Sequence, residues 1–351
     1  MGFLSNHDIK HLLKSGVLEI KPKPKMIGPM SVDLAIKDVF VLNADQLEII
    51  FPFIKDPTIN TDNFFMEGRA HLLNIDSLDL KPLSNVHEWY LQRGLPYMVR
   101  HREEFRFLGS VGFNIYTRSG YARRGIYSLG FGHDGKYFYE ILGPVITHRL
   151  SKLDRISQLV LVEPGTNYLD KSKIEEAVSG NHIIVTKDGK KVKEVEEYSD
   201  VKLGFIPLTL ADEVKYYPPD YLEQLYSPER FVDSELSSNS IPIGSFVLGI
   251  SNERVDICNE YVGALPHHVH KNLSLEELKN IECKTHHSIG IFHASSPFHQ
   301  PGSDGRIIFE IPDYEPDVIS AGMYVPLRIG KMTTPSSAYH GKFLNQSNIC
   351  L

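Results

Sequence analysis

The feature of this sequence that most constrains its fold is a match between its two halves. Residues 134–141 (DGKYFYEI) align without a gap with residues 304–311 (DGRIIFEI). Two further blocks match in the same order, 94–107 with 244–257 upstream and 155–156 with 328–329 downstream. A single match between two strand-like stretches can arise by chance, because apolar and polar residues alternate in many strands. Three matching blocks in the same order instead favour an internal duplication. We therefore predict two diverged copies of one β-domain.

The remaining pattern is typical of an all-β protein with a few short helices. Short apolar stretches punctuated by Gly and Pro indicate strands, at 31–36, 105–116, 136–141, 158–162, 245–250 and 306–311. Ser5 and Asp8 form a capping-box pattern, and Gly16 suits a helix end, so a helix is expected between them. Helical patterns also cover 171–178 and 274–280.

Length and composition set the outer limits. A chain of 351 residues with 42% hydrophobic and 23% charged residues is long enough for two globular domains. We place these at 1–165 and 205–351, joined by a charged linker or hairpin at 166–204. The net charge of −7 argues against a broad nucleic-acid surface, although not against a local basic pocket. Three cysteines are too few for a disulfide framework, and we expect no secretory leader, no membrane span and a cytoplasmic location.

Residues 118–125 (RSGYARRG) carry the sharpest local signal for chemistry. Three guanidinium groups, a hydroxyl and two glycines follow an apolar strand pattern within one short stretch. Arginine forks match phosphate oxygens, and glycine lets backbone N–H groups approach an anion. Composition alone supports an anion site or, equally, an exposed basic turn.

This segment resembles the Arg-Ser-Ser-x-x-Arg-x-Gly phosphate motif of deoxycytidine triphosphate deaminases and the Arg-Ser-Gly-x-Ala motif of dUTPases. Residues 4–9 (LSNHDI) and 31–34 (SVDL) look like the deaminase opening. Residues 321–330 resemble the Pro-Gly-Met-x-Ile-Gly strand of the family, and 339–346 (YHGKFLNQ) resemble its nucleotide-covering tail. The likeness lies in short blocks scattered over most of the chain, in the family's order.

The resemblance implies two tandem, distorted β-barrel domains of the dUTPase type and a pyrimidine deoxynucleoside triphosphate as the small-molecule partner. It gives Arg118, Ser119 and Arg123 the phosphate role, flanked by Gly120 and Arg124. It gives Glu310 the role of the base that activates water, and Glu140 stands at the same place in the first copy. Mg²⁺ is expected to arrive with the triphosphate.

Each copy departs from the family pattern where the other keeps it. The first copy has the phosphate motif but too few residues before Gly135 for the base-binding hairpin. The second has a hairpin-like stretch at 292–302, with Gln300 where the family has Asp, and Pro266-His267-His268 where a phosphate motif would stand. We therefore expect one composite site. Its remaining substrate-binding residues come from the hairpin and the tail: His293, Ser295, Ser296, Gln300, Tyr339, Lys342 and Gln346.

The expected reaction is zinc-independent hydrolytic deamination of dCTP, or of a close pyrimidine deoxynucleotide, to dUTP or its analogue. A zinc deaminase needs H-x-E with P-C-x-x-C, and only His101-Arg102-Glu103 supplies half of this pair. The alternatives are a dUTP or dCTP pyrophosphohydrolase, and a non-catalytic nucleotide-binding or structural module with the same fold. Duplication leaves the oligomeric state open, so a homo-oligomer is not excluded.

Two other motifs have simpler interpretations. Seven histidines between 267 and 299 form a dense group, but no carboxylate or thiolate stands at a recognised ligand spacing. We expect no metal site there. Residues 21–25 (KPKPK) could touch phosphate, but a solvated extended turn is the favoured interpretation.

Overall fold

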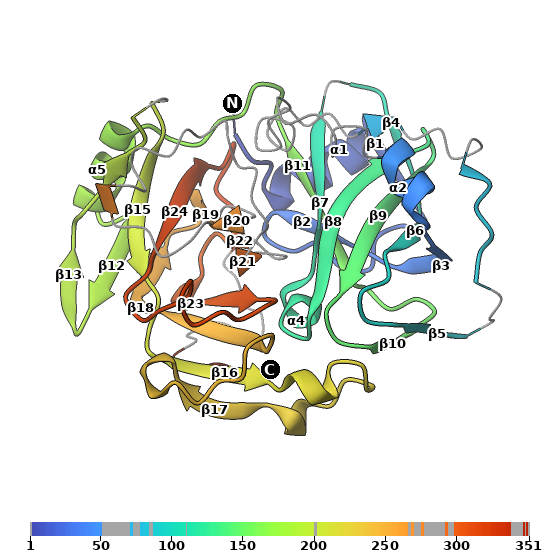
Figure 1. Ribbon diagram of the computed structural model, residues 1–351. Coiled ribbons are helices and arrows are strands. Elements are labelled where there is room, and N and C mark those ends of the chain that lie inside the picture. Colours follow the sequence, from blue (N-terminus) through green and yellow to red (C-terminus); the bar gives the residue numbers. More distant parts are fainter. Residues whose placement is uncertain are drawn as a thin grey trace.

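The structure is a computed structural model. It describes residues 2–50, 71–72, 78–83, 87–109, 111–199, 202–265, 268–269, 275–276, 292–293, 298–337, 347 and 349. Strands dominate these residues, which confirms a mostly β protein, and they form two lobes (Figure 1). The front half runs through β11 (Ser157–Val162), and the back half follows it.

The front half is built around β6, which pairs with β1, β3 and β9. Beyond β9 the sheet continues through β8 to β4, while β11 lies between β2 and β7 and β5 pairs with β10. The bounds of the front-half strands are β1 (Leu18–Lys21), β2 (Ser31–Leu34), β3 (Ile36–Val41), β4 (His71–Leu72), β5 (Glu88–Leu91), β6 (Tyr97–Phe107), β7 (Gly112–Thr117), β8 (Ile126–His133), β9 (Tyr137–Pro144) and β10 (His148–Ser151).

The back half is built around β18, which pairs with β12, β16 and β23. Here β24 lies between β15 and β19, as β11 lies between β2 and β7. The bounds of its strands are β12 (Ile183–Lys187), β13 (Lys190–Val192), β14 (Glu196–Glu197), β15 (Gly204–Thr209), β16 (Glu213–Tyr217), β17 (Val232–Glu235), β18 (Phe246–Ile257), β19 (Tyr261–Ala264), β20 (His268–Val269), β21 (Phe292–His293), β22 (Phe298–His299), β23 (Asp304–Ile311) and β24 (Tyr324–Lys331).

The helices are short and lie at the edges of the sheets. Their bounds are α1 (Asn6–Ser15), α2 (Ala44–Ile50), α4 (Ser119–Ala122) and α5 (Lys171–Ser179), with 3₁₀ turns η3 (Pro219–Tyr221), η4 (Pro228–Arg230) and η5 (Leu236–Ser238). The predicted first helix is confirmed: the Ser5 side chain accepts from the Asp8 N–H, and Gly16 ends the helix at φ 76°. The predicted helix at 171–178 is confirmed as α5, which Asp170 caps.

Each half begins with the same succession of elements. Helix α1 leads into β1, and α5 leads into β12, with a fully buried isoleucine, Ile9 or Ile174, on each helix. Strand β1 pairs with the end of β6, where Leu18 lies opposite Phe107. Strand β12 pairs with the end of β18, where Ile183 lies opposite Ile257. Both long strands also break register near their middle.

A buried glutamate lies in the irregular part of each long strand. Glu103 in β6 accepts a hydrogen bond from the Ala35 N–H at 2.9 Å. Glu253 in β18 accepts one from the Thr209 N–H at 2.7 Å. A bulge turns a side chain out of the regular alternation, and each of these carboxylates satisfies a backbone donor outside its own strand. Glu103 thus ties β6 to the connection between β2 and β3, and Glu253 ties β18 to β15.

Two apolar contacts join the halves. Phe3 lies 2% exposed between β11 and β24, where it packs with Val162 and Met332. A Cβ at Gly330 would lie 2.3 Å from the Phe3 ring, so glycine is required there. On the other side of the molecule, Tyr127 and Ile146 of the front half pack with a cluster of back-half residues, Tyr217, Leu222, Phe246, Leu248, Ile250 and Ile308. Burying one such aromatic side chain contributes about 1.5–3 kcal/mol.

The structure corrects two of the segments predicted from the sequence, and it describes a third only in part. The strand predicted at 105–116 is broken, because β6 ends at Phe107 and β7 begins at Gly112. The segment 166–204 is no linker: α5 and β12–β14 belong to it, and Ile174, Ile183 and Val195 are buried in the back-half core. The predicted charged hairpin is present, because β12 and β13 pair and are joined by a turn at Asp188 and Gly189. Of the helix expected at 274–280, the description covers Leu275 and Glu276, which are helical.

Candidate functional site

The 118–125 motif forms the connection between β7 and β8, at the boundary of the two lobes (Figure 1). The Tyr121 N–H donates to the Arg118 carbonyl at 2.8 Å, which starts α4. Gly125, at φ 81°, ends the turn in a conformation that favours glycine. Ser119 and Gly120 are half-buried, and a Cβ at Gly120 would meet no described atom within 4 Å. Among the described residues, nothing packs against the first turn of α4 at Gly120.

Arg118 is held at the front edge of this motif. Its backbone N–H donates to the Ile156 carbonyl at 2.6 Å, and its Nη1 donates to the Arg155 carbonyl at 3.2 Å. The same Nη1 lies 3.4 Å from Oδ2 of Asp33, a carboxylate whose side chain is 5% exposed. Burial raises the pKa of the Asp33 carboxyl, and the Arg118 charge opposes that rise. The Arg118 side chain remains 35% exposed, so part of the guanidinium is still open to a ligand.

Arg123 and Glu310 come together across the boundary between the halves. Arg123 follows α4 and is 6% exposed, and Glu310 lies in β23 and is 4% exposed. Burial raises the pKa of the Glu310 carboxyl from 4.5 to about 8, and the charge of nearby Arg123 opposes this rise. Arg123 of the front half therefore lies near enough to Glu310 of the back half for their charges to interact, while the shared site itself stays a prediction.

Sequence reasoning missed Tyr127, which shares this environment. It lies on β8, is 4% exposed, and its pKa is raised by burial and by the charge of Glu310. Tyr127 also packs with Phe246 and Ile308 of the back half. Its position depends on how the lobes pack, and no local pattern around residue 127 signals that.

Glu140 stands at the corresponding place in β9 but is surrounded differently. It is fully buried and accepts hydrogen bonds from Thr117 Oγ1, at 3.1 Å, and from Ser157 Oγ. Burial raises its pKa to about 7, and hydrogen bonds from hydroxyl groups oppose the rise. Donors of its own lobe thus hold Glu140, whereas Glu310 faces a cation of the other lobe. This contrast distinguishes the surroundings of Glu310 from those of Glu140.

Arg124, expected to bind substrate, is packed between tyrosines. Its guanidinium lies 5.4 Å from the ring centre of Tyr121 and 5.7 Å from that of Tyr226, a back-half residue. The Tyr226 ring also stacks on His148 at 4.9 Å, and the His148 ring nitrogen contacts the Arg124 carbonyl. Such cation–π contacts fix the guanidinium plane. Tyr226 is a second residue that sequence reasoning missed.

The back-half residues predicted to bind the base are only partly described. The backbone of His293 in β21 lies opposite Glu310 in β23, which places this residue beside the acid. Gln300 lies near the front half: a Cβ at Gly28 would be 4.0 Å from its Oε1. That oxygen is buried and has no hydrogen-bond partner among the described residues. Ser295 and Ser296 lie outside the described residues.

The predicted tail is described only at its flanks, and Tyr339, Lys342 and Gln346 lie outside the described residues. Before it, the Asn6 side chain donates to Ser337 Oγ at 2.7 Å. After it, Arg306 Nη1 donates to the Ser347 carbonyl at 3.3 Å. Ile349 packs against the apolar cluster that contains Tyr127 and Ile308. The described flanks of the predicted tail therefore contact the front half through Ser337 and the back half through Ser347.

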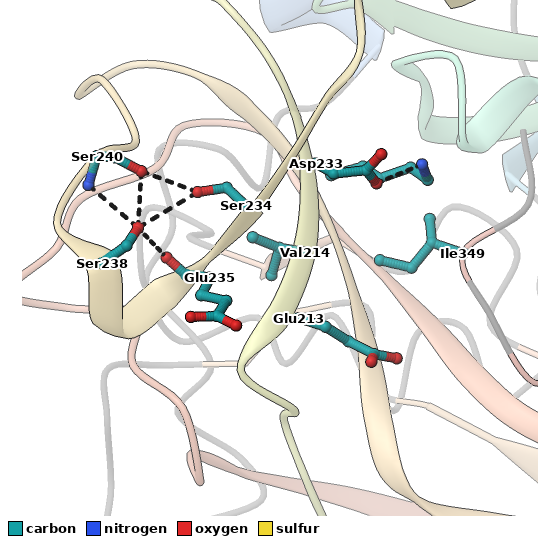
Figure 2. Close-up of a pocket in the computed structure, with 9 residues that line it drawn as sticks. Glu213, Val214, Asp233, Ser234, Glu235, Ser238, Ser240 and Ile349 are labelled. Carbon is teal, nitrogen blue, oxygen red and sulfur yellow. Dashed lines mark hydrogen bonds and ion pairs between the residues drawn. The ribbon is translucent and has the colours of Figure 1, made fainter.

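A pocket of about 750 Å³ lies between β16, β17 and Ile349 (Figure 2). Ser234, Ser238 and Ser240 hydrogen-bond to one another there, and Lys215 pairs with Asp233. None of the predicted site residues lines this pocket. Across the described ranges, no three His, Cys, Asp or Glu side chains are placed to hold a metal ion. No helix in the described part of the chain is long and apolar enough to cross a bilayer.

A comparison with solved structures finds a similar fold. The crystal structure of a 2′-deoxycytidine 5′-triphosphate deaminase from Agrobacterium tumefaciens superposes with a TM-score of 0.63 at 16% sequence identity, covering 95% of this chain and 96% of that one. No protein-family model matches the chain, and no curated protein sequence matches it. The chain therefore has a dCTP deaminase-like fold.

Proposed function

We propose that this protein is a zinc-independent hydrolase that deaminates dCTP, or a close pyrimidine deoxynucleotide, at a site between its two halves. The observation that carries the proposal is the approach of Arg123 to the buried Glu310. A cation from a phosphate-type motif and an acid with a raised pKa meet in one place, although they lie far apart in the sequence. The likeness in fold to a dCTP deaminase supports the same reaction class.

The two halves are, on this proposal, diverged copies that share one site. The order of strand pairing around β6 and β11 recurs around β18 and β24, which supports duplication. The front half supplies the phosphate side, with Arg118, Ser119 and Arg123 as the groups that bind the triphosphate. Gly120 leaves room for the phosphates, and Arg124 is held by its tyrosines at the edge of the motif. Mg²⁺ enters as part of the substrate, bound mainly by the phosphates themselves.

The back half supplies the base side and the acid. His293 and Gln300, with Ser295 and Ser296, bind the pyrimidine, and the tail with Tyr339, Lys342 and Gln346 covers the nucleotide. His293 pairs with the strand that carries Glu310, so the base and the water would meet at β23. Gln300 brings a buried amide oxygen, which accepts a hydrogen bond from an amino group.

The chemistry needs one group that takes a proton and returns it. Ionised Glu310 removes a proton from water, whose oxygen bonds to C4 of cytosine. The bond between C4 and the exocyclic nitrogen then breaks, and the proton passes to the leaving ammonia. A carboxyl with a pKa of about 8 is a stronger base than an ordinary glutamate and still an adequate acid near neutral pH. Tyr127, close to Glu310, helps to exclude water from its surroundings.

The test is a product assay. We expect the protein, incubated with dCTP and Mg²⁺, to release ammonia and form dUTP. Pyrophosphate from dUTP or dCTP would instead identify a pyrophosphohydrolase. Neither product from either nucleotide would overturn the enzymatic proposal and favour a non-catalytic binding module.

A further inference from the structure

A second basic site lies on the front half, away from the residues assigned above. A pocket of about 550 Å³ is lined by Lys21, Lys37, Arg102 and Lys152, together with Glu104 and Leu153. None of the candidate-site residues contributes to it. Its volume falls within the usual range for pockets that bind small molecules.

The sheet register brings these cations together from separate elements. Lys21 ends β1 and lies opposite Glu104 of β6, two residues beyond Arg102 on the same strand. Lys37 lies on β3 where its pairing with β6 shifts register, between the pairs Ile36–His101 and Asp38–Arg100. Lys152 comes from the turn between β10 and β11. The fold therefore brings these basic side chains together from separate segments, and they do not come from one basic run in the sequence.

The negative charge that lines the pocket is already engaged. Glu104 accepts a hydrogen bond from the Tyr137 hydroxyl at 2.6 Å, and its carboxylate lies 3.2 Å from Lys136 Nζ. Lys37 Nζ is held 3.1 Å from the same hydroxyl and 4.4 Å from the Tyr137 ring centre. Within the described part of the chain, Lys37, Arg102 and Lys152 have no ion pair with an acidic side chain.

The positive charge of this cluster is opposite in sign to the net charge of the chain. The sequence has 37 basic and 44 acidic side chains, yet four cations share one pocket with one lining carboxylate. Lys21 has an ion pair with Glu19 at 3.4 Å, and a bound anion would offset the repulsion among the other three cations. Ammonium and guanidinium groups together suit phosphate oxygens.

Leu153, next to Lys152 in the chain, adds an apolar side chain to the pocket lining. Leu153 is 47% exposed and has φ 75°, a conformation in which glycine is usual. It occupies a turn closed by two hydrogen bonds: the Asp154 N–H donates to the Ser151 carbonyl at 3.0 Å, and the Ser151 N–H donates to Asp154 Oδ2 at 2.8 Å. An unusual backbone conformation held by its surroundings is often found in binding sites.

We propose that this pocket binds a multiply charged phosphate anion, either an inorganic polyphosphate or the phosphate chain of a nucleotide. The site is separate from the boundary between the halves, and it does not depend on the reaction proposed above. The sequence motif at residues 21–25 contributes its first lysine to the site.

The test is calorimetric titration of the full chain with inorganic tripolyphosphate. All titrations use the Arg118→Glu variant. Reversing this charge is expected to abolish phosphate binding at the boundary between the halves, so that the remaining binding reports on the second pocket. Adding Lys37→Ala, Arg102→Ala and Lys152→Ala should weaken binding at least tenfold. Removing three exposed cations elsewhere, through Lys190→Ala, Lys191→Ala and Lys193→Ala, should leave binding within twofold.

Further arms identify the ligand and exclude other readings. A nucleoside triphosphate that competes with tripolyphosphate and binds more tightly marks a nucleotide site, and equal affinity marks a polyphosphate site; both support the proposal. Equal tripolyphosphate binding by the pocket variant and the control variant would overturn it. So would binding of a single-stranded DNA oligonucleotide without binding of tripolyphosphate, which would indicate a nucleic-acid surface. Unchanged thermal melting of the pocket variant shows that lost binding is not lost folding.

Discussion

Arg123, directly after a short helix of the front half, lies close enough to Glu310, in β23 of the back half, for its charge to lower the pKa of that buried carboxyl. Both side chains are almost fully buried, at 6% and 4% exposure. A charge that is taken out of water interacts strongly with its neighbours. The pair therefore links the protonation state of the acid in one half to the arginine motif of the other half.

Removing the Arg123 charge should shift the pH dependence of turnover. With Arg123→Gln, burial acts on Glu310 unopposed, so its pKa rises above about 8 and the ionised base forms only at higher pH. We expect the rising limb of kcat/KM for dCTP to move to higher pH, in addition to a lower rate. Arg123→Lys, which keeps the charge, should retain the wild-type limb. If the rising limb of kcat/KM for Arg123→Gln lay at the same pH as that of wild type, this would contradict an effect of the Arg123 charge on Glu310.

Glu310 should also make stability fall as pH rises. Its folded pKa, about 8, lies above the ordinary value of 4.5, so the folded state binds the proton more tightly. The stabilising contribution is complete below pH 4.5 and is lost as pH rises through 8. Glu310→Gln stays neutral, so its stability relative to wild type should increase between pH 5 and pH 9 by a few kcal/mol. Thermal melting across this range measures it, and a constant difference would be inconsistent with the burial described.

Glu140 provides the matched comparison for Glu310. It occupies the equivalent strand position, but Thr117 and Ser157 of its own lobe donate hydrogen bonds to it. Glu140→Gln should keep turnover within about twofold and should destabilise the protein by about 1–2 kcal/mol, because a carboxylate acceptor is lost. Urea denaturation and the ammonia assay give the two values. Turnover lost from a folded Glu140→Gln protein would mean that both acids act.

Tyr226 should stabilise the boundary through Arg124 and His148. Tyr226→Ala removes both ring contacts, and we expect about 2 kcal/mol of destabilisation together with a higher KM for dCTP. Tyr226→Phe keeps the ring and should behave as wild type. Tyr221→Ala is a matched control, because Tyr221 also lies under an arginine, Arg230, but is 41% exposed. Equal effects of the two alanine variants would remove any special role for Tyr226.

Local patterns predicted much of the fold. Ser5, Asp8 and Gly16 mark the first helix at both ends, because capping depends on neighbouring residues alone. The segment 166–204 was misread as a linker because its exposed lysines, such as Lys190 and Lys191, follow closely after the buried Ile183 and Val185. A half-buried edge hairpin and a solvated linker share much of their composition.

The sequence predicted only the part of the candidate site that follows from comparing the two copies of the internal repeat. Pairing Glu310 with the arginine motif followed from the missing parts of each copy, and the closeness of Arg123 agrees with it. Tyr127 and Tyr226 were not predictable, because their roles arise from the packing of one lobe on the other. Ser295, Ser296, Tyr339, Lys342 and Gln346 remain predictions.

The most direct test of the shared site is ammonia release from dCTP by two single variants, Arg118→Glu and Glu310→Gln, measured beside wild type. Arg118 belongs to the front half and Glu310 to the back half. If they serve one site, each change alone reduces release by at least about a hundredfold while the protein stays folded. Full ammonia release by either folded variant would show that the two groups do not work together.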